Sequence, residues 1–298
     1  MRILRAEIGP EQAGRKIKYF VRGELGVSHR QFNSLKTAEG LSVNGSAVHA
    51  NYILRAGDRV EVRLTEQAEA EVTPDAAPVS LVYEDEDIYI VDKPAPLACQ
   101  ASDRQPEQAL ENRLAHHFGP GFVFRPVNRL DKGTSGLMAA AKNAHAYQRL
   151  QRQLHTERFV REYLAVTEGV PLVPEGVIDL PIAKVNEASI RRVVDPERGK
   201  PALTRYRVEA TRDGRALVRL RLETGRTHQI RVHMSYLGCP VAGDFLYGTE
   251  LPELPGRFAL HSARIELDHP LSGERIVLES PLPPELTALM EAIRQPVD

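Results

Sequence analysis

The spacing of apolar residues divides the first 64 residues of the chain into short helical and extended segments. Between residues 14 and 21, Ile17, Phe20 and Val21 recur on one face of a helix. Residues 58–64 alternate between charged and apolar side chains, which indicates a half-buried strand. The pattern predicts a helix packed on a small sheet.

Two more elements complete this segment. Ser28 is a favourable N-cap for a second helix over residues 28–36. Residues 41–45 predict a short strand that ends in Asn-Gly, a strong hairpin signal. We therefore expect a small α/β module over residues 1–64.

A larger set of strands is expected after residue 78. Residues 88–94 predict a strand that stops at a proline, where we expect Lys93 to be a structural residue at a solvated strand end. Residues 137–141 form an unbroken apolar run, typical of a buried strand, and Asn143 can cap a helix over residues 144–154. Further strands are expected at residues 161–166, 204–208 and 216–222. Helices are few and separate from the strands, so the pattern predicts an α+β domain with a mixed, mostly antiparallel central sheet and flanking helices.

Charge is distributed unevenly, and this changes how the chain is divided. Residues 1–64 carry eleven basic against six acidic residues, although the whole chain has a net charge of −1. Residues 65–78 carry four acidic residues and no basic one, and they are rich in Ala, Pro and Thr. We expect a basic module at 1–64 that suits a polyanion, a solvated acidic linker at 65–78, and a main domain at 79–298.

Composition excludes several classes of protein. No run of about 18 apolar residues occurs, and the N-terminus lacks the apolar core of a signal peptide, so we expect no membrane association and a cytoplasmic location. Cys99 and Cys239 are the two cysteines, which makes a disulfide framework or a cysteine-based metal site implausible.

The segment Asn-Arg-Leu-Asp-Lys-Gly-Thr-Ser-Gly at residues 128–136 is the strongest chemical signal. Gly133 and Gly136 favour a sharp turn that presents Arg129 and Asp131 in front of the apolar run. A carboxylate on a rigid turn beside a sheet suits a nucleophile or a general base. A surface ion pair with a hydroxyl cap is the alternative interpretation.

Two other chemistries fit the sequence less well. His228 and His233 lie five residues apart without a third ligand at suitable spacing, so we expect no metal site and assign both to helix capping and packing. Asp131 with Ser135 and a histidine could suggest a hydrolase, but the chain has no Gly-x-Ser-x-Gly elbow.

The segment at 128–136 resembles the catalytic motif of the RluA-type pseudouridine synthases, usually written His-Arg-Leu-Asp-x-x-Thr-Ser-Gly. The chain departs from that motif at Asn128, where histidine is usual. Further segments resemble the same family in the same order, and they extend the resemblance across nearly all of 79–298: residues 91–94, 161–165, 224–233, 243–248 and 260–263. The resemblance implies the pseudouridine synthase fold.

The resemblance also implies roles for individual residues. Arg129 would fill the gap left by a flipped base, and Asp131 would act as the nucleophile or base. Tyr163 would stack on the base and serve proton transfer, while Arg231 would hold Asp131 ionised and aimed through a planar two-point pair. Leu260 would supply an apolar wall. No cofactor is implied, because the isomerisation needs neither redox change nor external energy.

The small module resembles the RNA-binding module of ribosomal small-subunit protein four, through Val43-Asn44-Gly45 and residues 56–60. The resemblance places RNA-phosphate contacts on its first two helices, at Arg15, Lys16, Lys18, Arg30 and Lys36. An amphipathic helix pair with solvated lysines is the alternative.

Together these features predict a monomeric, cofactor-independent RNA pseudouridine synthase. We expect it to isomerise uridines in structured RNA, with ribosomal RNA favoured and transfer RNA open. The competing interpretation is a catalytically silent RNA-binding or ribosome-assembly protein with the same fold.

Overall fold

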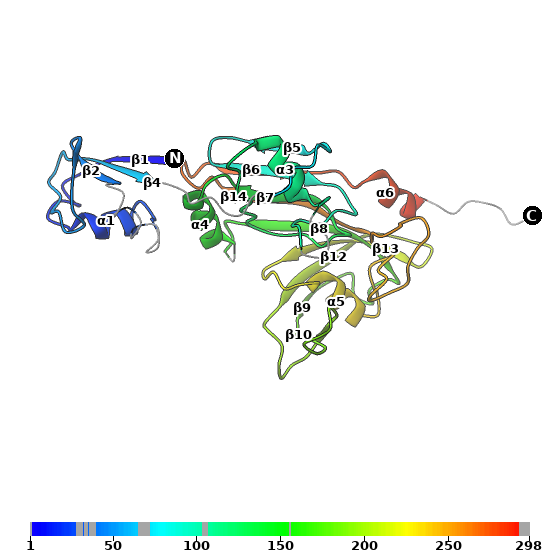
Figure 1. Ribbon diagram of the computed structural model, residues 1–298. Helices are drawn as coiled ribbons and strands as arrows, with labels where there is room; N and C mark the ends of the chain where they lie inside the picture. Colours follow the sequence, from blue (N-terminus) through cyan, green and yellow to red (C-terminus); the bar gives the residue numbers. More distant parts are fainter. Residues whose placement is uncertain are drawn as a thin grey trace, which may run out of the picture.

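The computed structural model describes residues 2–27, 32, 35, 40–64, 72–102, 107–154 and 156–291. Figure 1 shows the N-terminal module at one end of the molecule, beside a larger domain. Within the described residues the module has a four-stranded sheet in the order β1-β4-β2-β3 and helix α1. Its elements are β1 (Arg2–Glu7), α1 (Ile17–Gly23), β2 (Leu41–Val43), β3 (Ser46–Ala47) and β4 (Arg59–Leu64).

The core of the module follows the predicted pattern. Ile17, Phe20 and Val21 are buried on α1 and pack against the strands. Asn44 and Gly45 both have positive φ, at 52° and 83°, which gives the predicted hairpin between β2 and β3.

Two features of the module differ from the prediction. Helix α1 begins at Ile17 rather than at residue 14, because residues 10–14 form turns and Lys16 forms a β-bridge with Ile53. Strand β1 has no counterpart in the sequence pattern. The predicted helix at 28–36 lies outside the described residues except for Phe32 and Leu35, which are helical and buried.

The main domain is built on a nine-stranded sheet, counted over the described residues. Its order is β5-β6-β7-β14-β8-β13-β12-β9, with β15 paired to β14. Its pairs are antiparallel except β14 with β7, so the sheet is mixed and mostly antiparallel, as predicted. The strands are β5 (Ser80–Glu84), β6 (Ile88–Lys93), β7 (Ser135–Ala141), β8 (Val160–Glu168), β9 (Glu175–Asp179), β12 (Leu203–Arg212), β13 (Arg215–Leu222), β14 (Leu260–Asp268) and β15 (Arg275–Glu279).

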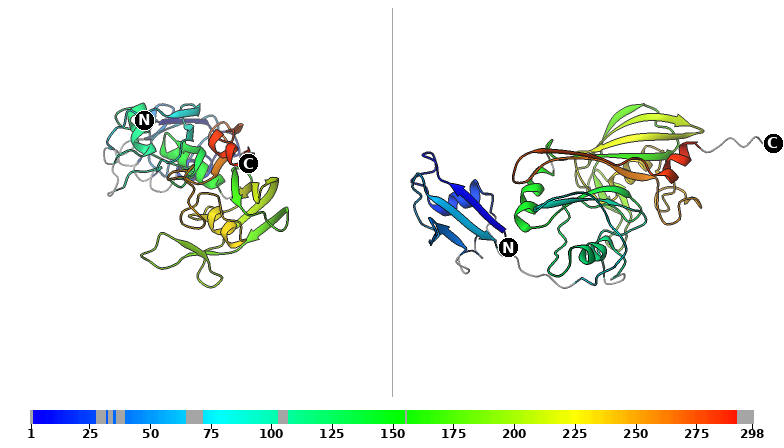
Figure 2. Two further views of the ribbon diagram at one scale, coloured as in Figure 1. Left: turned by 90° about the vertical axis from the view of Figure 1, so that its right-hand side faces the viewer. Right: turned by 90° about the horizontal axis from the view of Figure 1, so that it is seen from above.

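Helices and a small hairpin flank this sheet (Figures 1 and 2). They are α3 (Leu110–Phe118), α4 (Ala144–Gln153), α5 (Gln229–Tyr236) and α6 (Pro284–Glu291), with the two-stranded sheet of β10 (Ile182–Lys184) and β11 (Arg192–Val194). Asn143 caps α4 as predicted, because its side chain accepts the backbone N–H of Ala146 at 2.9 Å. Among the described residues no helix has the length and apolarity that a membrane span requires.

Strands β6 and β7 are buried on both faces, which explains their unbroken apolar runs. Tyr89 and Met138 point into one core, shared with α3 and α5, whereas Ile90 and Leu137 point into a second core, shared with α4. The helices therefore cover both faces of the sheet at β6 and β7.

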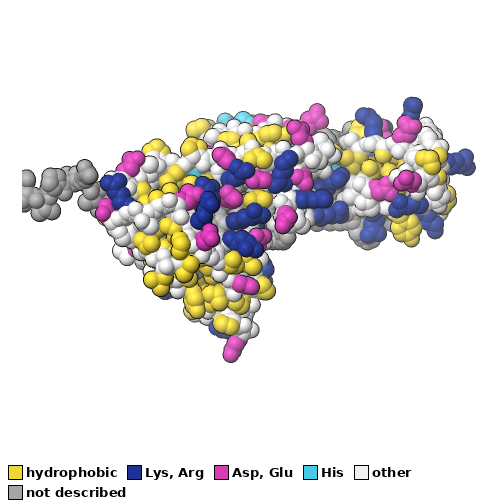
Figure 3. Space-filling model, turned by 180° about the vertical axis from the view of Figure 1, so that it is seen from behind, with side chains coloured by type: hydrophobic (Ala, Val, Ile, Leu, Met, Phe, Trp, Pro, Cys, Tyr) yellow, Lys and Arg dark blue, Asp and Glu magenta, His cyan; other side chains and the backbone are white. Residues whose placement is uncertain are grey.

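Strands β8, β12, β13 and β14 instead present charged side chains on an outer face. The buried Val218 and Leu220 alternate with half-buried Arg219 and Arg221 along β13. Six arginines pair with carboxylates that lie on these strands or directly after them: Arg205, Arg207, Arg219, Arg221, Arg264 and Arg275. Figure 3 shows the molecule from behind, with basic and acidic side chains intermingled across the middle.

The described part of the acidic linker, residues 72–78, makes hydrogen bonds to the main domain, while four of its seven residues are exposed. The Asn112 amide of α3 donates to the Thr73 carbonyl at 2.8 Å, and the Asp75 N–H donates to the Asn112 carbonyl at 3.0 Å. Leu271, in the turn between β14 and β15, packs against both the module core and the core beside α4.

Lys93, predicted at a solvated strand end, is fully buried at the end of β6. Its ammonium donates to the carbonyls of Pro94 at 3.0 Å, Leu97 at 2.8 Å and Lys132 at 3.4 Å. These bonds tie the turn after β6 to the loop before β7, so the proline ends the strand without exposing the lysine. Burial lowers the pKa of Lys93 to about 8.

Lys93→Met should destabilise the fold by about 3 kcal/mol, because the apolar side chain leaves buried carbonyls without a donor. Denaturant unfolding measures this change. Above pH 8 the unfolded chain binds more protons at residue 93 than the folded protein, so wild-type stability should rise from about pH 8 toward 10.5. Lys93→Met should lack the rise in stability that comes from residue 93. An equal rise in both proteins would contradict the lowered pKa of Lys93.

Candidate functional site

Asp131 lies in the loop that leads into β7, and three contacts fix this loop. The Thr134 N–H donates to the Asp131 carbonyl at 3.0 Å, which closes the turn. The Lys132 carbonyl accepts the Leu97 N–H at 2.9 Å in addition to the Lys93 ammonium. A Cβ on Gly133 would come within 2.6 Å of the Phe258 ring, so the turn needs glycine there. The Asp131 side chain remains 26% exposed.

The start of β7, directly after this loop, lies very close to the backbone of β14. Gly136 has a φ of 104°, and a Cβ there would lie 2.3 Å from the Ser262 carbonyl oxygen. Ser135 also bonds to His261 Nδ1 at 2.9 Å. The parallel pairing of β7 with β14 therefore brings the start of β14, with Leu260, beside the Asp131 loop.

Arg231, on α5, is 3% exposed and contacts two carboxylates. Its Nη1 donates to Asp131 Oδ2 at 3.0 Å. Its Nε and Nη2 donate to the two oxygens of Asp244 at 2.7 and 2.8 Å. The predicted two-point pair with Asp131 is therefore wrong: Asp244 takes the planar pair, and Asp131 receives a single bond from the remaining edge of the guanidinium.

Asp244 was not predicted as a site residue, although it lies in a segment that resembles the family. It is fully buried, and its Oδ1 also accepts the backbone N–H groups of Leu246 at 3.0 Å and Tyr247 at 3.2 Å. These bonds anchor one end of Arg231. The sequence offers one indirect signal for this role. A buried aspartate usually needs a basic partner, so an aspartate in a segment expected to be buried predicts a nearby arginine or lysine.

Two aromatic rings enclose the Arg231 guanidinium. Its central carbon lies 4.1 Å from the ring centre of Phe258 and 5.0 Å from that of Tyr247. Burial alone would lower the pKa of Arg231, but Asp244 and then Asp131 outweigh that effect and raise it. The guanidinium is therefore a permanent, rigid charge beside Asp131.

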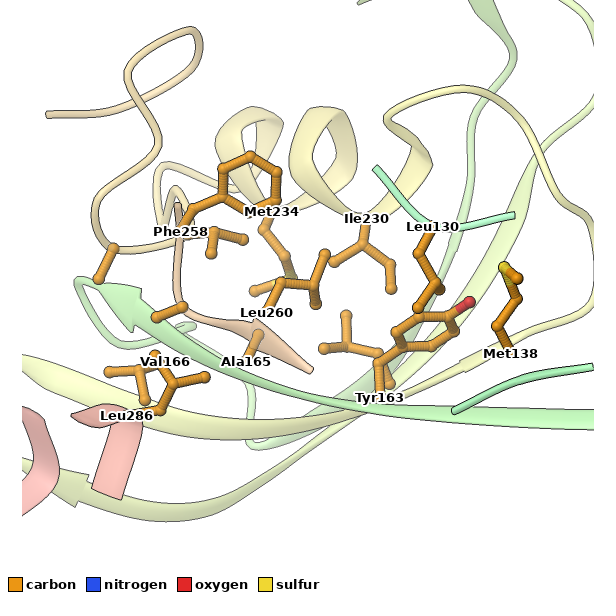
Figure 4. Close-up of a cluster of buried hydrophobic side chains, with 14 of the residues drawn as sticks. Leu130, Met138, Tyr163, Ala165, Val166, Ile230, Met234, Phe258, Leu260 and Leu286 are labelled. Carbon is orange, nitrogen blue, oxygen red and sulfur yellow. The ribbon is translucent and has the colours of Figure 1, made fainter. Parts of the chain in front are cut away.

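Tyr163 and Leu260 lie in the apolar cluster next to this pair. Both are buried, at 5% and 4% exposure, and Figure 4 shows them with Leu130, Met138 and Ile230. Burial raises the pKa of the Tyr163 hydroxyl, and the charge of Asp131 acts in the same direction. The tyrosine therefore stays neutral at physiological pH and offers a ring and a hydroxyl near the carboxylate.

His228 also lies close to Asp131, and the sequence analysis did not predict this proximity. It has a left-handed backbone at the start of α5 and makes no side-chain cap, so the predicted capping role is wrong. Its Nε2 lies 4.0 Å from Asp131 Oδ2, and its Nδ1 lies 2.9 Å from the Tyr247 hydroxyl. That hydroxyl accepts the Arg192 N–H at 2.8 Å and can direct its proton at Nδ1, which leaves the ring hydrogen on Nε2. Burial lowers the pKa of His228 and favours the neutral ring.

His233, in contrast, is a packing residue as predicted. Its ring nitrogens lie 2.9 Å from Thr204 Oγ1 and 3.0 Å from the Leu180 carbonyl. Among the described residues, Asp85, Asp87 and His269 form a group that could ligate a metal. Asp85 already accepts two backbone N–H groups of its own turn, so this group has a structural explanation.

The remaining candidates are exposed or lie elsewhere. Arg129 is exposed next to the Asp131 loop and donates to Gln100 Oε1 at 3.1 Å. Asn128 is buried, and its Oδ1 accepts the Ala139 N–H at 3.0 Å, so it fastens the loop to β7.

The RNA-contact candidates lie at the far end of the molecule, in the N-terminal module. Arg15 and Lys16 are exposed and precede α1, and Lys18 is half-buried in its first turn. Arg15 pairs with Glu24 at 2.5 Å. Arg30 and Lys36 lie outside the described residues.

Comparison with known proteins gives a consistent result. A family model described as RNA pseudouridylate synthase matches residues 87–236. A Bacillus subtilis protein named uncharacterized RNA pseudouridine synthase YjbO is 37% identical over 274 residues, which cover 90% of this chain and 96% of that protein. The ribosomal large subunit pseudouridine synthase D of Haemophilus influenzae is 34% identical and covers 98% of this chain and 95% of its own length.

A solved structure agrees with these sequence matches. Human RNA pseudouridylate synthase domain containing 1 superimposes with a TM-score of 0.57 and 29% identity, over 70% of this chain and 84% of that chain. The family match, the similarity over almost the whole chain and the superposition therefore lead to one conclusion: the chain belongs to the RNA pseudouridylate synthase family.

Proposed function

We propose that this RNA pseudouridine synthase isomerises uridines of ribosomal RNA, with Asp131 as the reacting carboxylate. The observation that supports the proposal is the linked arrangement of Asp131, Arg231 and Asp244. Arg231 and Asp244 are buried, and Asp131 alone of the three is open to a substrate, next to Tyr163. Such an arrangement fixes a charged carboxylate before the substrate arrives.

The reaction needs this kind of site. The bond between uracil and ribose breaks at nitrogen, the base turns, and a new bond forms at a ring carbon, so the enzyme must retain a detached base. The uridine must first leave its stack, and Arg129 is exposed where it can take the vacated position. The apolar wall of Leu260 and Leu130 excludes water from the base. Tyr163 offers a ring for stacking and a neutral hydroxyl for proton transfer.

The choice of RNA rests on two further features. Relatives similar over almost the whole chain carry the name ribosomal large subunit pseudouridine synthase D. The N-terminal module is basic, and its Arg15, Lys16, Lys18, Arg30 and Lys36 suit contacts with RNA phosphate. Mapping pseudouridines in cellular RNA with and without the protein tests this choice; sites confined to transfer RNA would overturn it.

A catalytically silent RNA-binding protein is the competing function. Such a protein would have no reason to keep a carboxylate and a buried guanidinium in contact beside an open apolar wall, because an unused buried charge costs stability.

Asp131→Asn preserves shape and removes the charge of the carboxylate. We expect turnover to fall by more than about a thousandfold while RNA affinity stays within about threefold, because the lost interaction acts in the reaction and not in binding. Single-turnover assays at saturating RNA, beside a binding titration, measure both quantities. Comparable conversion by the variant would remove Asp131 from the mechanism.

Arg231→Lys and Asp244→Asn test the positioning of Asp131. A lysine cannot bond both carboxylates, so we expect turnover to fall at least about tenfold, with little change in affinity. Asp244→Asn breaks a buried pair and should also cost about 3–5 kcal/mol of stability, measured by unfolding. Arg207→Lys, on the outer face of the sheet, is the matched control. Normal turnover in Arg231→Lys would contradict the positioning role.

Deletion of residues 1–70 tests the module. The main domain should stay folded, because among the described residues its two cores share only Leu271 with the module core, and residues 72–78 keep their contacts with α3. RNA affinity should fall, and the slope of log affinity against log salt should decrease by about 0.7–0.9 for each lost phosphate contact. If the slope is unchanged, the module does not bind the substrate RNA.

A further inference from the structure

Arg161, on β8, is a buried guanidinium without a counter-ion in the described part of the chain. Its side chain is 4% exposed, and neither Nε nor Nη2 has a hydrogen-bond partner. Tyr163 and then Glu223 favour its charge, but the Tyr163 hydroxyl is neutral at physiological pH, and the Glu223 carboxylate already pairs with Arg205 at 3.1 Å and Arg221 at 3.8 Å. Burial lowers the pKa of Arg161. An unpaired buried charge is costly to keep.

The position of Arg161 connects it to the site. It lies two residues before Tyr163 on the same face of β8, so the two side chains leave the strand about 7 Å apart. Nη1 lies 3.0 Å from where a Cβ of Gly225 would be, in the turn that leads to α5. Gly225 is exposed, so this turn is the boundary between the guanidinium and solvent.

A comparison with Arg257 separates a structural role from a binding role. Arg257 is equally buried, at 5% exposure, but its Nη1 pairs with Glu285 and its Nη2 donates to Ser135 at 3.1 Å. Arg257 therefore holds α6 to the start of β7. Arg161 has donors of the same kind with nothing in the described residues to receive them.

We propose that Arg161, beneath the turn at Gly225, binds a backbone phosphate of the RNA next to the flipped uridine. This inference rests on the proposed function, because that function places the flipped uridine beside Tyr163, two residues from Arg161 on β8. A phosphate at this turn supplies the missing counter-ion and accepts from Nη1, the guanidinium nitrogen that lies nearest to Gly225.

Arg161→Met tests the proposal by two measurements of opposite sign. RNA affinity should fall by about tenfold to a hundredfold, the effect of a lost charge-assisted contact. Stability of the free protein should rise, because the variant removes an unpaired buried charge. Arg257→Met should instead lose stability, and Arg207→Met, which removes one paired outer arginine, should leave RNA affinity unchanged. A loss of stability in Arg161→Met would assign Arg161 to the fold and overturn the proposal.

RNA with a single uncharged methylphosphonate, 5′ or 3′ of the target uridine, identifies the ligand atom. At one of these positions the methylphosphonate should lower the RNA affinity of the wild-type protein and leave the RNA affinity of Arg161→Met unchanged. If replacement of a uracil oxygen by sulfur shows this coupling and the methylphosphonates do not, Arg161 binds the base, and the phosphate assignment is wrong. Both proteins carry Asp131→Asn in these titrations. Failure of the proposed function would appear as absent pseudouridine formation, whereas failure of this inference would appear as absent coupling.

Discussion

The contact of Arg231 with two aspartates is the interaction on which the site depends. Asp244 takes the planar edge of the guanidinium deep in the protein, and the remaining edge reaches Asp131. Two carboxylates share one guanidinium, so the group carries a net negative charge, and that charge is located at its exposed end. The free-energy cost of burying charged groups therefore falls on Arg231 and Asp244, away from the substrate, and only the Asp131 carboxylate faces the substrate.

This contact in turn requires accurate placement of three chain segments. Asp131 comes from the loop before β7, Arg231 from α5, and Asp244 from the loop before β14. Gly136 lets β7 approach the backbone of β14, and Lys93 ties the turn after β6 to the Asp131 loop. Both contacts lie inside the main domain, so the site is held by the same interactions that hold the sheet.

The sequence predicted features that depend on local pattern. The burial of β7, the cap at Asn143 and the hairpin at Asn44–Gly45 follow from apolar runs and turn chemistry, and the structure confirms them. Asp131 and Arg231 were brought together by motif resemblance, since 100 residues separate them in the chain.

The features that the sequence did not predict depend on which side chains meet in space. Lys93 seemed solvated because a strand end beside proline is usually exposed, but carbonyls from two loops converge on it. Asp244 and His228 gained their partners only through the fold. The geometry of Arg231 was mistaken for the same reason, because a motif names residues without saying which edge of a guanidinium faces which acid.

The ion pairs on the outer face of the sheet have a consequence for heat resistance. The free-energy cost of removing charged groups from water falls as temperature rises, whereas hydrophobic stabilisation per unit area levels off. The paired arginines and carboxylates of β8, β12, β13 and β14 should therefore contribute a growing share of stability on warming.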